Sequence, residues 1–126
     1  MDTETAVREF IDDYAGVFST ADPAAIAERF HEPALLVGEQ VRLLESRAEV
    51  EALFGVILDG LQDRGYTRSA AEEIEVEVVG PDRARARVEW VRYAGEDVLE
   101  RLTTTHVFRR TDDGWKMVVL LPHGSQ

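Results

Sequence analysis

The sequence contains no cysteine among its 126 residues, which excludes disulfide bonds, thiolate metal sites and a cysteine nucleophile. It also contains no apolar run near the roughly 20 residues that a membrane-spanning helix requires. The N-terminal residues 1–4 include two acidic side chains, and no signal-like apolar segment follows them. We therefore predict a cytoplasmic protein with no membrane partner.

Positive charge is scarce in this chain. There are 25 aspartates and glutamates against 14 lysines and arginines, for a formal net charge of −11. Such a field repels phosphate groups, so we expect no nucleic-acid partner. Lys116 is the only lysine, a bias that either a GC-rich genome or salt adaptation of the host would produce. The length and the 44% hydrophobic content predict a single domain over residues 1–126.

The sequence also lacks the usual signatures of a metal or cofactor. Its three histidines, His31, His106 and His123, are too scattered to form a recognisable metal site. The Gly80-Pro81-Asp82 segment is typical of a turn, and no glycine-rich phosphate loop is present. We therefore expect neither a bound metal nor a cofactor.

Three segments in the first half of the chain show the 3.6-residue apolar period of helices. The first covers about residues 3–19. The second is a short helix over about residues 23–30 that begins with proline, whose missing N–H has no role at a first helical position. The third begins at Ser46, where Ser46 and Glu49 form a capping-box pattern, and ends near Gly65.

From residue 74 the apolar period changes to two, which is typical of strands. We expect strands over residues 74–78, 84–90, 98–110 and 115–121, joined by short turns into an antiparallel meander. Two short extended segments, 34–38 and 41–44, precede the third helix, and residues 123–126 are expected to be loose. Helices followed by strands predict an α+β fold in which three helices pack on a strongly bent antiparallel sheet.

The order of elements and two motifs resemble the nuclear transport factor 2-like superfamily. The motifs are FHEPA at residues 30–34 and FRRTDDGW at residues 108–115. Within the superfamily, the chain looks like the SnoaL-like polyketide cyclases and the ketosteroid isomerases, over essentially its whole length. The resemblance implies a cone-shaped α+β barrel of the cystatin-like kind, and it implies homodimers. Because the superfamily includes isomerases, hydrolases, cyclases and adaptors, no single activity is implied.

The ketosteroid isomerases allow a comparison of individual positions. Tyr14 falls where their helix-one tyrosine donates a hydrogen bond to the substrate oxyanion. Their general-base aspartate would fall near Gly38, which has no side chain, and their second oxyanion donor would fall near Thr104 or His106. The resemblance therefore implies a hydrogen-bond donor without the base.

Strand alternation predicts a pocket without reference to any family. In the segment 98–110, Arg101 and Arg109 favour exposure of one face and Phe108 favours burial of the other. This alternation points Thr104 and His106 inward and leaves the direction of Glu100 open. The remaining side chains expected on the inner face are Ile74, Val76, Val78, Ala84, Ala86, Val88 and Trp90.

The two small alanines leave room beside these polar groups, and polar groups on an apolar concave wall are typical of a ligand site. The pocket is predicted to be lined by Tyr14, Phe18, Phe30, Phe54, Leu58, Trp90, Thr104 and His106. The alternative for His106 is a core histidine bonded to backbone, and for Tyr14 a buried ring bonded to a nearby carbonyl.

Three functions remain open at this point. The first is binding of a small, largely apolar ligand whose identity the sequence does not specify. The second is an enzyme that moves protons on a steroid- or polyketide-like substrate, as an isomerase, cyclase or dehydratase, with His106 as acid or base and Tyr14 as donor. The third is a non-catalytic dimerisation or interaction module.

The last strand is apolar on both of its faces. Alternation places Trp115, Met117, Val119 and Leu121 on one face and Val118 and Leu120 on the other. One set can line the core, and the other needs a cover. We predict a homodimer through the outer face of the sheet; a helix covering the second set is the alternative.

Overall fold

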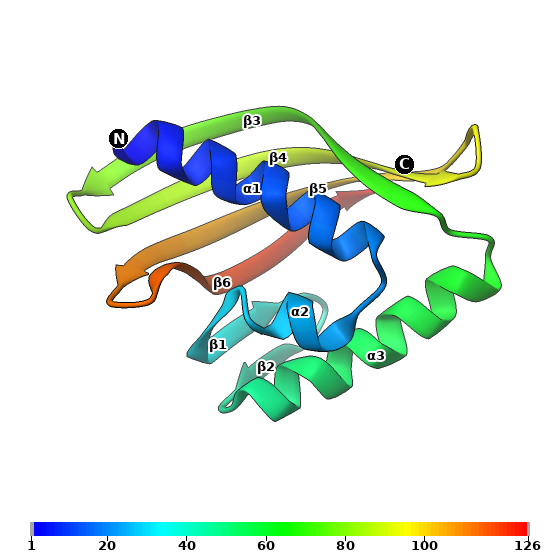
Figure 1. The fold of residues 1–126 in the computed structure, drawn as a ribbon, viewed down its shortest axis with the longest axis horizontal. Helices are drawn as coiled ribbons and strands as arrows, with labels where there is room; N and C mark the ends of the chain where they lie inside the picture. Colours follow the sequence, from blue (N-terminus) through cyan, green and yellow to red (C-terminus); the bar gives the residue numbers. More distant parts are fainter. Residues whose placement is uncertain (1, 126) are drawn as a thin grey trace.

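The computed structural model describes residues 2–125, and its three helices precede the long strands as the change of period predicts (Figure 1). Side chains cap the first two helices. The Asp2 carboxylate accepts the Thr5 N–H at 2.7 Å, and the Asp22 carboxylate accepts the Ala24 N–H at 3.1 Å. The helices are α1 (Thr3–Ser19), α2 (Pro23–Ala27) and α3 (Arg47–Asp63).

Two details of the helices differ from the sequence prediction. Ser46 Oγ accepts the Glu49 N–H at 3.3 Å, as a capping box requires, but the Glu49 carboxylate accepts the N–H of Glu45 instead of that of Ser46. The second helix also ends before Phe30. Phe30 instead begins a strand, where it pairs with Met117 and buries its ring in the core.

Within residues 2–125, six strands form one sheet in the order β2-β1-β6-β5-β4-β3. β3 to β6 make the predicted antiparallel meander. β1 and β6 run parallel, which corrects the prediction of a wholly antiparallel sheet. β6 also continues through residues expected to be loose, because the long β5 offers partners as far as Ser125. The strands are β1 (Phe30–Val37), β2 (Val41–Leu44), β3 (Arg68–Gly80), β4 (Arg83–Ala94), β5 (Asp97–Thr111) and β6 (Gly114–Ser125).

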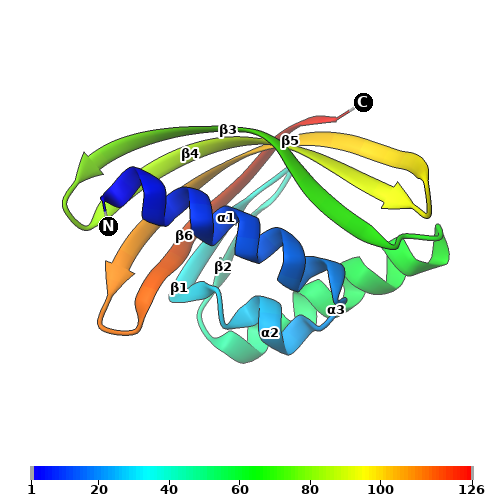
Figure 2. The same ribbon diagram turned by 45° about the horizontal axis from the view of Figure 1, so that its top comes forward.

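The helices lie together on the concave side of the sheet, with α1 along β3 and α3 beside β1 and β2 (Figure 2). The sheet is strongly curved, and β2 and β3 form its two edges. The predicted α+β class, three helices packed on a bent sheet, is therefore confirmed. Over the described residues the strands do not close into a complete barrel, so the fold is an open cone.

The alternation predicted for β4 and most of β3 agrees with the observed burial. Ala84, Ala86 and Val88 are fully buried, or nearly so, on the inner face. Val78 pairs with the buried Ala84 and so lies on the predicted inner face, but it is 49% exposed. Arg8 of α1 donates to the Ile74 carbonyl at 2.9 Å, and Val78 lies four residues further along β3, near the end of the strand.

A β-bulge at Val118 changes which side chains of β6 face the core. Val107 pairs with Val119, and the next residue of β5, Phe108, pairs with Met117, so Val118 is left between them. Met117 is buried, whereas Val119 shares the outer face with its partner Val107. The simple alternation predicted for β6 was wrong because the bulge adds one residue to one strand.

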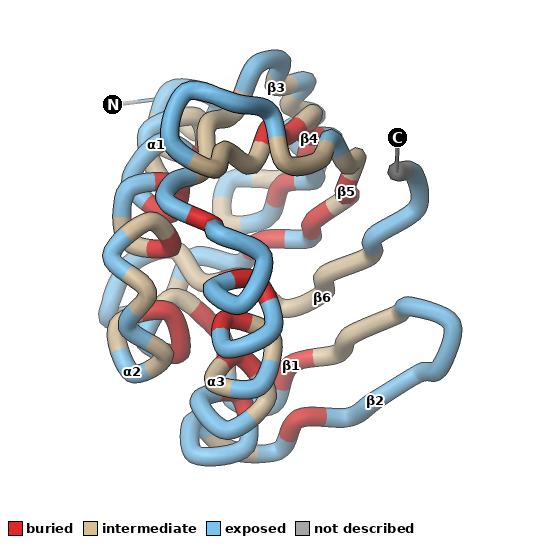
Figure 3. Tube along the Cα trace, turned by 90° about the vertical axis from the view of Figure 1, so that its right-hand side faces the viewer, coloured by how far each residue is buried: buried red, intermediate tan, exposed pale blue. Residues whose placement is uncertain are grey.

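Buried segments concentrate where the helices meet the inner face of the sheet (Figure 3). Among residues 2–125, no helix combines the length and the apolar character needed to cross a membrane.

Candidate functional site

A cavity of about 200 Å³ lies between α1, α3 and the inner face of the sheet. Its buried floor is formed by aromatic and polar side chains, and its exposed rim includes Gly38 and Pro122. Most of the wall is apolar, which is the usual composition of a small-molecule site. The lining residues are Tyr14, Phe18, Leu36, Gly38, Phe54, Ile57, Ser69, Trp90, Arg92, Leu102, Thr104, His106, Leu120 and Pro122.

Three polar side chains of the floor form a hydrogen-bonded chain. Trp90 of β4 donates its indole N–H to Thr104 Oγ1 at 2.7 Å. Thr104 Oγ1 in turn lies 2.7 Å from Nε2 of His106, two residues further along β5. Both β5 residues are buried, with Thr104 4% and His106 2% exposed. The two-residue strand period therefore places both groups on the same inner wall.

His106 is held as a neutral imidazole. Burial lowers its pKa from 6.5 to about 3, because the charged form would lose its hydration. Its ring stacks on Phe108 with centroids 5.6 Å apart. Nε2 is engaged by Thr104, while Nδ1 is buried and has no hydrogen-bond partner among the described residues. His106 is thus a core side chain with one unused polar atom.

Tyr14 reaches the cavity from the inner face of α1. Its ring packs edge-on against Trp90, with centroids 6.0 Å apart, and against Phe18 on the next turn of the helix. Burial raises the pKa of the Tyr14 hydroxyl far above its usual range, so the group keeps its proton at any physiological pH. The hydroxyl is available as a hydrogen-bond donor.

The predicted aromatic and aliphatic cap divides into two layers. Phe18 and Phe54 line the cavity, with ring centroids 6.2 Å apart. Phe30 and Leu58 lie behind them in the core, outside the lining. Phe30 packs against Phe54 at 5.3 Å and supports the wall from behind. The structure therefore brings together Tyr14, Phe18, Phe54, Trp90, Thr104 and His106, and it places the other two predicted residues one layer away.

The family model described as NTF2-like protein (DUF6841) matches residues 3–125. The chain belongs to this NTF2-like family. No functionally curated protein matches it.

Solved structures show the same fold. An NTF2-like protein with a cystatin-like fold from Novosphingobium aromaticivorans is 25% identical, with a TM-score of 0.76 over 94% of this chain and 79% of its own. A domain of unknown function with a cystatin-like fold from Nostoc punctiforme is 22% identical, with a TM-score of 0.76 over 94% of this chain and 75% of its own. A ketosteroid isomerase-like protein from Erwinia carotovora is 16% identical, with a TM-score of 0.69 over 94% and 92% of the two chains, and this likeness shows the fold alone.

Gly38 of this NTF2-like chain lies on the cavity wall, just beyond the end of β1. It supplies no side chain to the site, although a Cβ there would meet only the Gln40 carbonyl oxygen, at 3.9 Å. A larger residue would therefore fit at position 38, but the glycine there contributes no side chain to the cavity.

Sequence reasoning missed Arg92, which lines the cavity from β4. The signal was present, because Arg92 continues the alternation that runs through Val88 and Trp90 on the inner face. Ser69 and Leu120 were missed for other reasons. Ser69 lies before residue 74, where the predicted strand begins. Leu120 pairs with His106 on the inner face because the bulge at Val118 breaks the simple alternation with Met117.

Glu100, whose direction the alternation left open, lies beside the cavity and outside its lining. Its carboxylate pairs with Arg64 at 2.7 Å and with Arg92 at 3.5 Å. Within the described part of the chain, no three histidine, aspartate or glutamate side chains come together as a metal site would require.

Proposed function

We propose that the protein binds a small, largely apolar molecule in the cavity between α1, α3 and the sheet. The observation that carries this proposal is the composition of the cavity. A wall of aromatic and aliphatic side chains surrounds a buried polar chain, Trp90–Thr104–His106, in which one imidazole nitrogen has no partner. A few polar groups on an otherwise apolar wall are the usual means by which such a cavity orients a ligand.

Binding without chemistry is better supported than proton transfer. A general base works best with a pKa near the working pH, and the pKa of His106 is about 3. The partner of His106 is a threonine hydroxyl, whereas a catalytic histidine is commonly oriented by a carboxylate. The wall position to which the resemblance assigns a general base is Gly38, which has no side chain. Proton transfer by His106 and Tyr14 is therefore the weaker alternative.

The experiment fills the cavity and measures ligand binding by calorimetry. Two neutral probes are used: 2-naphthamide, with an aromatic skeleton, and decanamide, with a flexible chain. Ile57 and Val56 are neighbours on α3, but Ile57 lines the cavity whereas Val56 is 72% exposed. Ile57→Trp is expected to lower affinity at least tenfold, and the matched control Val56→Trp is expected to leave it unchanged.

The proposal fails if binding survives Ile57→Trp in a folded variant, because the probe then occupies another place. It also fails if both substitutions weaken binding equally. Circular dichroism of each variant shows whether the fold is retained.

A further inference from the structure

Among the described residues that line the cavity, Arg92 is the one charged side chain. Its side chain is only 18% exposed, and its guanidinium lies 5.3 Å from the centre of the Phe18 ring. In the sheet, Arg92 stands between Ser69 on β3 and Glu100 on β5. The largely buried guanidinium of Arg92 therefore lines an apolar cavity, next to Ser69, which lines it as well.

The charges around Arg92 do not balance. Glu100 is shared by two arginines, and its shorter contact, 2.7 Å, is with Arg64. Arg92 has the longer contact of 3.5 Å, beyond the usual range of a strong hydrogen bond. Glu72 is bound to a different arginine, Arg101, at 2.7 Å. One carboxylate against two guanidinium groups leaves the set of Arg64, Glu100 and Arg92 with a net charge of +1, in a protein whose net charge is −11.

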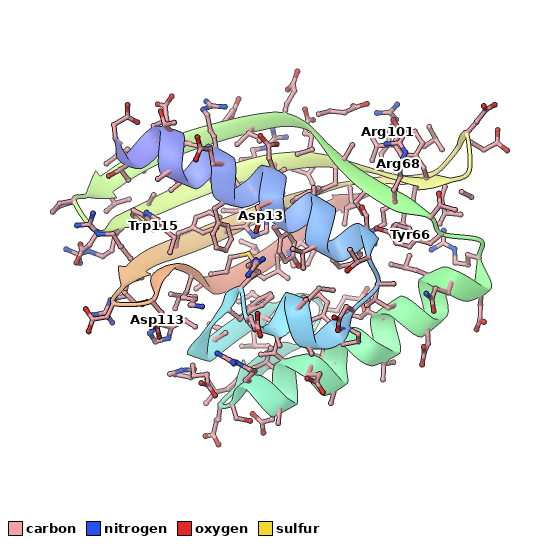
Figure 4. All side chains as sticks on the ribbon, viewed as in Figure 1. Asp13, Tyr66, Arg68, Arg101, Asp113 and Trp115 are labelled. Atoms are coloured by element: carbon pink, nitrogen blue, oxygen red, sulfur yellow. The ribbon has the colours of Figure 1, made fainter. Side chains whose placement is uncertain are left out.

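The end of the molecule that carries this charge is marked in Figure 4 by Tyr66, Arg68 and Arg101. The Tyr66 hydroxyl bonds Ser69 Oγ at 2.6 Å and so holds the serine beside Arg92. Arg68 stacks on the ring of Tyr93, 3.8 Å from its centre, which directs this cation to the ring. Arg92 is therefore the arginine at this end that is directed into the cavity.

We propose that the natural ligand is an amphipathic monocarboxylate whose anionic head binds Arg92 and whose apolar body fills the aromatic chamber. This inference rests on the proposed binding function and names the chemical class of the ligand. The planar guanidinium can hold a carboxylate through two parallel N–H···O bonds. A phosphate dianion usually takes more donors than the single arginine and one serine at this end of the described lining provide, whereas a carboxylate needs fewer.

The test compares acids with their matched amides by calorimetry at pH 7. The probes are 2-naphthoate with 2-naphthamide, and decanoate with decanamide; within each pair the skeleton is the same and only the charge differs. The parent protein is expected to bind the acid of at least one pair about tenfold more tightly than its amide. Arg92→Gln should abolish that preference, because the charge-assisted hydrogen bonds are lost.

Arg68→Gln is the matched control, because Arg68 lies at the same end of the molecule, stacks on Tyr93 and does not line the cavity. It should keep the preference for the acid. Glu100→Gln removes the carboxylate that competes for Arg92 and should raise the affinity for the acid several-fold. Thermal unfolding of each variant confirms that the comparison is made between folded proteins.

The outcomes separate the two proposals. If the amides bind in the cavity as tightly as the acids, or if Arg92→Gln still prefers the acid, the proposal that an anionic group binds Arg92 is overturned. The proposed binding of an apolar molecule then still stands. If none of the four compounds binds the parent protein, both proposals are overturned. An acid preference that disappears in Arg68→Gln as strongly as in Arg92→Gln would mean that surface charge, and not the cavity arginine, selects the acid.

Discussion

The hydroxyl of Thr104 lies 2.7 Å from Nε2 of His106, and both side chains are buried on the inner wall of the cone. The same hydroxyl accepts the indole N–H of Trp90 at 2.7 Å. One threonine therefore satisfies polar groups from two strands, β4 and β5. This position should be more sensitive to substitution than its apolar surroundings.

Replacing Thr104 by valine should lower the free energy of unfolding by about 1–3 kcal/mol, because the Trp90 N–H and His106 Nε2 both lose their partner in a buried place. Thr105→Val is the matched control. The Thr105 hydroxyl bonds the exposed His123 at 2.8 Å, so its loss should change stability by less than about 0.5 kcal/mol. Urea denaturation measures the free energy of unfolding of the two variants. Equal losses would contradict a stabilising role for the hydrogen bonds that join Trp90, Thr104 and His106.

Stability should depend on the protonation of His106. The pKa is about 3 in the fold and near 6.5 in the unfolded chain, so between these values the unfolded state binds more protons. The contribution of His106 is fully present above pH 6.5 and is lost as the pH falls towards 3, at up to about 1.4 kcal/mol per pH unit. His106→Gln should flatten the stability curve between pH 6 and pH 4 in denaturant titrations, whereas His123→Gln, at an exposed site, should not. An unchanged slope in His106→Gln would contradict the buried neutral imidazole.

The homodimer through the outer face of the sheet stays a prediction. The bulge at Val118 decides which side chains of β6 lie on that face, because Met117 turns into the core while Val119 pairs with Val107 on the outside. Light scattering at micromolar concentration should give a mass near twice 14.2 kDa. Val107→Glu should shift the protein to the monomer, and Val98→Glu, at another exposed position of β5, should not. A monomeric parent protein would refute the dimer.

The helices and the meander could be predicted because local signals decide them. Asp2, Asp22 and Ser46 are capping residues that act within their own turn, and the change of period near residue 74 reflects burial of one strand face. The parallel pairing of β1 with β6 could not be predicted. It joins segments such as Leu35 and Val119, far apart in the chain, and no local pattern encodes which strands meet.

The polar floor of the candidate site could be predicted, because strand alternation places Thr104 and His106 on the inner face. The partner of His106 did not follow, because a two-residue spacing permits the Thr104 bond without requiring it. Phe30 and Leu58 were assigned to the wall because an apolar pattern cannot distinguish a lining residue from one packed behind it. Arg92 continued the inward alternation, but a charged residue at an inward position is normally taken to end the buried stretch.

The central claim, that a small apolar molecule enters the cavity, is tested most directly by nuclear magnetic resonance of the two tryptophan indole N–H groups. Trp90 lines the cavity, whereas Trp115 lies at the far end of the sheet from Tyr66 and outside the lining (Figure 4). Trp115→Phe assigns the two signals. Addition of 2-naphthoate or 2-naphthamide should shift the Trp90 indole signal and leave that of Trp115 in place. A shift of Trp115 alone, or no shift of Trp90 at saturating probe, would contradict binding in the cavity.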